Sequence, residues 1–246
     1  MFDLSRELGV KSITFREERS AQKVARLIRQ CGCSCTDISS CHVDYDHPDT
    51  WPELLEAFLQ ERITITGNGV VQCTPDKRYN RRYFEFARLA KSRLVSVNFP
   101  PEEHEATIRS IVELCGEFGI PAAIHNHGGK HWLDSFTMVD YILNRSPEWL
   151  GLCFDTAWCI QSGGKPLDWL ETFGPRIRGI HFKDFIFERN GQWINTPIGE
   201  GCLDLPTVLE KFRHLNFDGS ACIEYEGEEP LAATRKSAET IRKYLD

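Results

Sequence analysis

The sequence predicts an α/β fold, and a single (β/α)8 barrel formed by residues 1–246 is the simplest member of that class. Apolar runs with a period of two alternate with amphipathic stretches with a period of 3.6 along the whole chain. This alternation favours a parallel sheet with helical crossovers. The length of 246 residues is also that at which eight strand–helix units close into one barrel. An open doubly wound sheet, which would show the same alternation, remains the alternative.

Eight strands and eight helices are expected in strict alternation. The strands are predicted at residues 11–16, 34–39, 62–68, 94–98, 121–127, 151–155, 179–184 and 220–226. Helices are predicted at 20–31, from 51 to about 59, at 80–91, from 102 to 119, at 135–144, from 166, from 205 and at 232–245. Their core faces include Leu54, Leu55, Phe58 and Leu59 in the second helix, and Tyr83, Phe84, Phe86 and Leu89 in the third.

Composition and charge limit the class of protein. Hydrophobic residues make up 41% and charged residues 26%, which is typical of a soluble globular chain. The net charge of −7 argues against a nucleic-acid partner, because phosphate binding requires a concentrated basic surface. No apolar run approaches the roughly 20 residues of a membrane span, and the first residues lack the pattern of a signal peptide. We therefore expect a cytoplasmic protein with a small-molecule substrate, no membrane partner and possible homo-oligomers.

The ten cysteines are scattered through the chain. Their apolar surroundings predict reduced thiols that act as small hydrophobic side chains. The group formed by Cys31, Cys33, Cys35 and Cys41 lacks the paired Cys-x-x-Cys arms typical of a structural zinc site.

Four consecutive predicted strands, the fifth to the eighth, end in side chains that can bind a metal. These side chains are His125, Asp155, His181 and Glu224. The carboxyl ends of barrel strands meet on one face, so the four should converge. Two imidazoles and two carboxylates suit one divalent cation, with Mn, Co, Fe, Ni, Zn and Mg as candidates. Individually, each histidine could instead be a hydrogen-bonded core residue, and Asp155 a helix cap.

Five short motifs together resemble the xylose isomerase-like TIM-barrel superfamily. They are IHNHG at 124–128, FDTA at 154–157, IHFKD at 180–184, PIGEG at 197–201 and IEYE at 223–226. The superfamily includes sugar phosphate isomerases and epimerases, inosose dehydratases and endonuclease IV. The resemblance covers nearly the whole chain and is strongest at residues 122–226.

The resemblance places Asp155, His181 and Glu224 on three of the family's four metal-ligand positions. His125 falls on the fourth, where the epimerases usually carry a glutamate. A histidine at this position is more similar to the inosose dehydratase branch. The loss of one carboxylate also removes one of the two acid–base groups of the epimerases.

The activity implied first is that of a metal-dependent sugar isomerase or epimerase, which removes a proton next to a carbonyl through an enediolate. The alternative is a dehydratase acting on a keto-inositol or 3-keto-sugar, and a non-catalytic sugar-binding barrel is a third interpretation. Glu224 is the expected base, and Lys183 would neutralise the oxyanion or act as an acid. A second proton transfer would fall to His127, Lys183 or Glu226. Lys183 could instead be a surface lysine paired with Asp184.

Five residues are predicted to contact substrate. Trp158 stands where many relatives have a histidine, and it could be an aromatic wall for a sugar ring or a packed core residue. Trp132 would border the pocket, and Glu200 lies in a segment that could fold over it. Asn98 and Glu226, at the ends of the fourth and eighth strands, complete the set.

An endonuclease IV-like function is disfavoured. That enzyme's metal cluster needs further histidines after strands three, four and six. The corresponding residues here are Asn68, Asn98 and Trp158.

Overall fold

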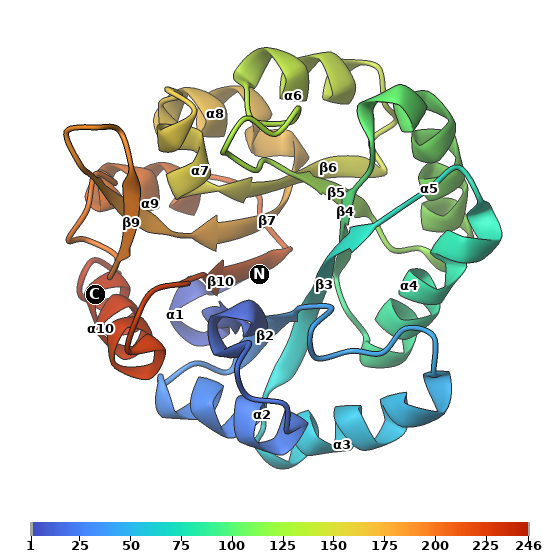
Figure 1. Ribbon diagram of the computed structural model, residues 1–246, viewed down its shortest axis with the longest axis horizontal. Helices are drawn as coiled ribbons and strands as arrows, with labels where there is room; N and C mark the ends of the chain where they lie inside the picture. Colours follow the sequence, from blue (N-terminus) through green and yellow to red (C-terminus); the bar gives the residue numbers. More distant parts are fainter. Residues whose placement is uncertain (1, 246) are drawn as a thin grey trace.

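A computed structural model describes residues 2–245 and shows a closed barrel of eight parallel strands surrounded by helices (Figure 1). The strand order around the barrel is β1-β10-β7-β6-β5-β4-β3-β2, and β1 pairs with both β2 and β10. The predicted (β/α)8 barrel is therefore confirmed, and the open sheet is wrong. The strands are β1 (Gly9–Lys11), β2 (Cys35–Ile38), β3 (Thr64–Gln72), β4 (Leu94–Asn98), β5 (Ala122–His125), β6 (Leu150–Asp155), β7 (Ile177–Phe182) and β10 (Ser220–Ile223).

The eight predicted helices are all present. They are α2 (Ala21–Gln30), α3 (Trp51–Gln60), α4 (Lys77–Ala90), α5 (His104–Phe118), α6 (Phe136–Asn144), α8 (Pro166–Phe173), α9 (Leu205–Arg213) and α10 (Pro230–Lys243). Several begin at a side-chain cap: Ser20, Asp76 and Ser135 accept hydrogen bonds from the backbone N–H groups of α2, α4 and α6. Among residues 2–245 we find no helix with the length and apolar character needed to cross a bilayer.

Further elements were not predicted. Two short helices, α1 (Leu4–Glu7) and α7 (Thr156–Gln161), lie before β1 and directly after β6. A hairpin of β8 (Asp184–Phe187) and β9 (Trp193–Thr196) follows β7 and projects at the left of Figure 1. Four 3-10 turns complete the chain: η1 (Ser12–Phe15), η2 (Pro48–Thr50), η3 (Pro101–Glu103) and η4 (Gly174–Arg176).

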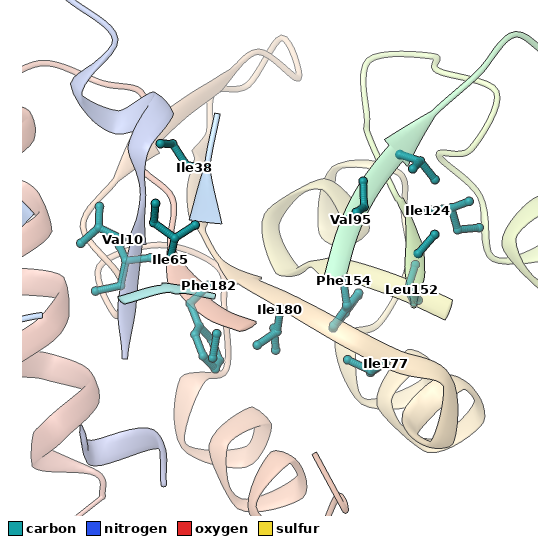
Figure 2. Close-up of a cluster of buried hydrophobic side chains, with 14 of the residues drawn as sticks. Val10, Ile38, Ile65, Val95, Ile124, Leu152, Phe154, Ile177, Ile180 and Phe182 are labelled. Carbon is teal, nitrogen blue, oxygen red and sulfur yellow. The ribbon is translucent and has the colours of Figure 1, made fainter. Parts of the chain in front are cut away.

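Alternation along each strand separates two layers of side chains. Buried apolar residues of the barrel strands, including Ile180 and Phe182 of β7, form the layer shown in Figure 2. Phe182 packs edge-on against Phe212 of α9, so this layer lies between strands and helices. The residues of opposite parity face the barrel axis. His181 shows this directly, because its ring reaches Asp37 on β2, with β10 and β1 lying between the two strands.

The first and third predicted strands differ most from the observed bounds. The first was expected at residues 11–16, but β1 ends at Lys11 and residues 12–15 form a 3-10 turn. The hydroxyls of Ser12 and Thr14 accept backbone N–H bonds from Ser39 and Tyr225, which favours the turn over a longer ladder. The third strand was expected to end at residue 68, but β3 continues to residue 72 past a register shift against β4.

Two predicted core residues are wrong. The side chains of Leu59 in α3 and Leu89 in α4 are 68% and 51% exposed. The buried faces are centred on Phe58 in α3 and on Phe84 and Ala87 in α4. Leu59 directly follows Phe58, and Leu89 lies two residues after Ala87. Because a helix turns by about 100° per residue, both leucines point away from the buried face.

Asp184 anchors the segment between β9 and α9. Its buried carboxylate accepts four backbone hydrogen bonds of 2.9–3.1 Å, from Phe185, Gly199, Gly201 and Leu203. A side chain at Gly201 would collide with this carboxylate. The alternative interpretation of Lys183 as a surface lysine paired with Asp184 is therefore wrong, because Lys183 is buried and Asp184 is bound by backbone N–H groups.

We predict that Asp184→Ala lowers the free energy of unfolding by about 2–4 kcal/mol, because it removes the acceptor of several buried donors. Asp204→Ala, which removes an exposed cap of α9, should cost only about 1 kcal/mol. Urea unfolding of both variants measures this difference. Equal losses would show that the Asp184 network contributes no more than an ordinary helix cap.

The predicted reduced state of the cysteines agrees with the structure, in which all ten are free. Burial raises the pKa of Cys33 to about 11 and the pKa values of Cys31 and Cys115 to about 12. Cys202 alone is exposed, and Cys41 is half-buried.

In the native protein at pH 8, we expect one fast-reacting thiol per chain towards an aromatic disulfide reagent, and a second slow one. The thiolate is the reactive form, and burial withholds it at the other positions. Cys202→Ser should abolish the fast phase, and unfolding should release the remaining thiols. Several fast thiols in the native protein would contradict the packing described here.

Candidate metal centre and active site

Four buried side chains meet at the carboxyl-terminal end of the barrel. His125 and Asp155 are the last residues of β5 and β6, His181 lies in β7, and Glu224 directly follows β10. Each offers one ligand atom, and these atoms all lie within 4.8 Å of one another. We call these residues the four-residue cluster. The structure thus brings together all four predicted metal ligands, and the group could hold a metal ion.

The histidine rings face each other across the barrel interior. His125 Nε2 lies 3.1 Å from His181 Nδ1, although β6 separates their strands. His181 Nδ1 also lies 3.1 Å from Glu224 Oε2, and His125 Nε2 lies 3.9 Å from Asp155 Oδ2. Four potential ligand atoms therefore point towards one small volume.

Two carboxylate oxygens of the cluster have no hydrogen-bond donor. Asp155 Oδ1 accepts the backbone N–H of Trp158 at 2.9 Å and caps α7, whereas its Oδ2 accepts none. Asp155 is thus a helix cap through one oxygen and leaves the other towards the cluster. Glu224 Oε2 also accepts no hydrogen bond. Buried carboxylate oxygens without partners are costly, so these residues fit a bound divalent cation.

Neighbouring polar side chains fix the strand ends. Asn126 exchanges hydrogen bonds of 2.8 and 2.9 Å with the backbone N–H and C=O of Asp155. The Thr156 hydroxyl donates to the backbone carbonyl of Lys183 at 2.6 Å and accepts its N–H at 3.0 Å. Both side chains are buried, so β5, β6 and β7 present the cluster from a rigid edge.

Lys183 is fully buried beside the cluster. Its ammonium donates to Glu224 Oε1 at 2.7 Å and to Glu226 Oε1 at 2.5 Å. Burial opposes the charge, but Glu224, Asp155 and Glu226 outweigh it and raise the pKa of Lys183. This lysine is a fixed cation and not a proton acceptor near neutral pH.

The acidic and imidazole groups are shifted in different directions. Burial raises the pKa of Asp155 to about 7, with Lys183 opposing the shift. Burial also disfavours the charged form of Glu224, but Lys183 and His181 hold its pKa well below the usual range. Burial and His181 lower the pKa of His125, whereas Cys153 and Asp37 overcome burial and raise that of His181.

A cavity of about 180 Å³ opens beside the cluster. It is lined by Val70, Gln72, Asn98, His125 and His127. Asn98, a predicted substrate contact, therefore lies in it. Gln72 was not predicted to contribute because β3 was expected to end at residue 68. Gln72, not Asn68, ends the third strand, and Asn68 Nδ2 points to the Tyr83 carbonyl.

His127 is the exposed imidazole of the site. Its Nδ1 lies 3.0 Å from the Gly128 carbonyl, which leaves Nε2 available to a ligand. The ring stacks on Trp158 at 4.7 Å, and the Lys183 ammonium lies 5.0 Å from the Trp158 ring centroid. Trp158 is only 7% exposed, so it supports His127 and Lys183 and offers little free surface as a substrate wall.

The other predicted substrate residues are dispersed. Glu226 contacts Lys183, as described above. Trp132 is half-buried, packs against Phe99 and donates its indole N–H to the Phe99 carbonyl at 2.9 Å. Glu200 forms an ion pair with Lys236 of α10, on the outer helical layer. Their contact with substrate stays a prediction.

Two residues near the cluster were not predicted, Lys11 and Asp37. They are register partners on β1 and β2 and are buried in the barrel interior. A usable signal existed, because a charged residue inside a strand that is expected to be buried requires a buried partner.

Comparison with known protein families matches residues 94–244 to the family described as xylose isomerase-like TIM barrel. The chain belongs to this family. The resemblance noted from its motifs is thereby confirmed, with an enzyme superfamily as the setting for the cluster.

Individual relatives of this xylose isomerase-like barrel are distant. An inosose dehydratase from Bacillus velezensis is 28% identical over 61% of this chain and 56% of that protein. The chain spans about half the length of the curated relatives that it matches. A xylose isomerase-like barrel from Mycobacterium smegmatis, solved with magnesium, has a TM-score of 0.78 at 13% identity, covering 100% and 98% of the two chains. A probable 3-DHS dehydratase from Bacillus anthracis has a TM-score of 0.74 at 16% identity, covering 95% and 97%.

We predict that affinity for a divalent metal rises with pH through about 7, because Asp155 holds a proton below its pKa of about 7 and must release it on binding. The raised pKa of His181 should extend this rise above pH 7. Chelator competition between pH 6 and 8.5 measures the slope. An affinity independent of pH would contradict the protonation states described here.

Proposed function

We propose that the chain is a divalent-metal-dependent dehydratase that removes water from a cyclic polyhydroxy ketone, such as a keto-inositol or a 3-keto-sugar. The observation that carries the proposal is the buried four-residue cluster, with two carboxylate oxygens free, beside a small polar cavity. His125, Asp155, His181 and Glu224 would hold the cation. A cation there would polarise a substrate carbonyl and acidify the neighbouring C–H bond.

Glu224 would remove the C–H proton. Its Oε2 accepts no hydrogen bond, and a carboxylate oxygen that binds a cation through one lone pair keeps a second lone pair for a proton, which a metal-bound imidazole nitrogen lacks. The Lys183 ammonium keeps the carboxylate ionised at neutral pH. The same ion pair weakens Glu224 as a base, so the reaction requires a substrate C–H that is already acidified. Lys183 stays protonated and would stabilise the negative charge that develops on the substrate oxygen.

His127 would protonate the departing hydroxyl. It lines the cavity, stacks on Trp158, and is an imidazole outside the four-residue cluster. The proton lost from carbon then resides on Glu224, and a proton from His127 leaves with the hydroxyl as water. Solvent exchange returns both residues to their starting states. Gln72 and Asn98 would hydrogen-bond to the remaining hydroxyls of the substrate.

Dehydration is favoured over isomerisation or epimerisation, which the sequence placed first. Inversion at a carbon needs acid–base groups on both faces of the substrate. His125 stands in the cluster where a second carboxylate would serve, and a metal-bound imidazole is a poor base. The names of the relatives, inosose dehydratase and probable 3-DHS dehydratase, support the same choice.

The two proton-transfer roles can be separated by isotope exchange in deuterated water. We expect metal-loaded wild type to dehydrate at least one of a panel of keto-inositols, 3-keto-glucosides and free ketoses. His127→Asn should still exchange the C–H proton but lose dehydration by about 10²–10⁴-fold, because only the acid is missing. Glu224→Gln should lose both reactions.

The control is Glu171→Gln, which removes an exposed ion pair with Lys211 and should retain full activity. Metal content of each variant must be measured in parallel, because Glu224 also belongs to the cluster. If deuterium enters the same or an adjacent carbon and no water is lost, the reaction would be epimerisation or isomerisation and not dehydration. Absence of both exchange and metal binding in the wild type would contradict the proposed function.

A further inference from the structure

A buried ion pair lies inside the barrel behind His181. The Lys11 ammonium donates to the Gly69 carbonyl at 2.5 Å and lies 3.4 Å from Asp37 Oδ2. The same Asp37 oxygen lies 3.0 Å from His181 Nε2. Both charged side chains are almost completely buried, and they come from register partners on β1 and β2. The pair therefore reaches His181 from the opposite wall of the barrel.

The two nitrogens of His181 face different carboxylates, and Cys153 Sγ lies 4.0 Å from Nδ1 and 3.5 Å from Nε2. Nδ1 faces His125 and Glu224, and Nε2 faces Asp37. An imidazole that binds a metal through Nδ1 must carry its proton on Nε2, and that proton then has an acceptor in Asp37. A carboxylate in this position fixes the tautomer and orientation of the ring and makes the ligand nitrogen more basic.

We propose that Asp37 is a positioning residue for metal binding, which holds His181 with Nδ1 towards the four-residue cluster. The Lys11 ammonium offsets the energetic cost of burying the charged Asp37 carboxylate. This inference rests on the proposed metal-dependent function. The two members of the ion pair are assigned different roles. Asp37 governs metal affinity through His181, whereas Lys11 governs stability.

A second metal site is a weaker interpretation of the same residues. Asp37, Cys153 and His181 also have ligand atoms within 4.8 Å of one another. The Lys11 ammonium, however, already lies 3.4 Å from the Asp37 oxygen that such a site would use. A second cation would have to share that oxygen with a fixed positive charge, which electrostatics disfavours.

The effect expected of a substitution at Lys11 follows from the cost of an unpaired buried charge. Removing one partner of a buried ion pair leaves an unpaired charge and is strongly destabilising, whereas removing both is far less so. Among residues 2–245, Lys11 is the one lysine or arginine that pairs with the Asp37 carboxylate, and Asp37 Oδ1 accepts no hydrogen bond. Lys11→Met should therefore destabilise the protein without touching a cluster residue.

The test combines metal affinity with stability for four variants of the full chain. Co²⁺ affinity is measured by chelator competition and by the visible spectrum of the bound ion, and stability by urea unfolding of the metal-free protein. The variants are Asp37→Asn, Lys11→Met, the double variant and Asp184→Asn. The last is the matched control, because it makes the same change at a buried carboxylate that contacts only backbone N–H groups.

We expect Asp37→Asn and the double variant to bind Co²⁺ about 10–100-fold more weakly, with an altered spectrum, and Lys11→Met to stay within about threefold of wild type. Lys11→Met should show a lower urea midpoint that the second substitution partly restores. Asp184→Asn should lose stability and keep its affinity. The two properties would then follow different members of the pair.

A folded Asp37→Asn variant with wild-type Co²⁺ affinity would overturn the proposal, as would affinity losses that merely parallel stability in all variants. If Asp37→Asn does not fold, the double variant provides the test, because removing both members of a buried ion pair is far less destabilising than removing one. A wild-type affinity in that variant would also count against the proposal. Failure of the wild type to bind Co²⁺ would defeat the proposed function itself, and the stability results would then identify a purely structural pair.

Discussion

Charge burial inside the barrel is the constraint on which the site depends. Asp37, Asp155 and Glu224 are carboxylates with almost no access to water, and an isolated buried charge is costly. The barrel places two lysines in the same interior, Lys11 against Asp37 and Lys183 against Glu224. These pairings still leave Asp155 Oδ2 and Glu224 Oε2 without donors. Because of this remaining demand for positive charge, the cluster could hold a metal ion.

Barrel topology explains how distant segments supply this arrangement. Neighbouring strands β5, β6, β7 and β10 carry one cluster residue each, and the opposite wall, β1 and β2, carries the ion pair that reaches His181. At the carboxyl-terminal end of the barrel, short segments complete this arrangement. Helix α7 begins directly after its cap Asp155 and places Trp158 against His127 and Lys183. A scaffold of rigid strand ends with a few adapted side chains suits chemistry in which groups must be held and not moved.

Sequence periodicity predicted the barrel and the four cluster residues because each depends on local information, a strand that ends in a polar side chain. The partners of those residues depend on contacts across the barrel, which no local pattern reveals. Lys11 was expected at the start of a strand and proved to be its last residue, so its contact with Asp37 was not foreseen. Burial decided between the two interpretations of Lys183, whereas a substrate contact by Trp158, which is 7% exposed, stays a prediction. The Glu200 side chain points towards Lys236, its ion-pair partner in a helix far along the chain, and no local pattern reveals this contact.

The most direct test of the central claim is a crystal structure of the Co²⁺-loaded protein with anomalous scattering measured at the cobalt edge. The account predicts one strong peak per chain, within bonding distance of His125 Nε2, Asp155 Oδ2, His181 Nδ1 and Glu224 Oε2. His181 Nε2 should remain hydrogen-bonded to Asp37 in that structure. A peak among Asp37, Cys153 and His181 instead, or no peak in the barrel at all, would contradict the account.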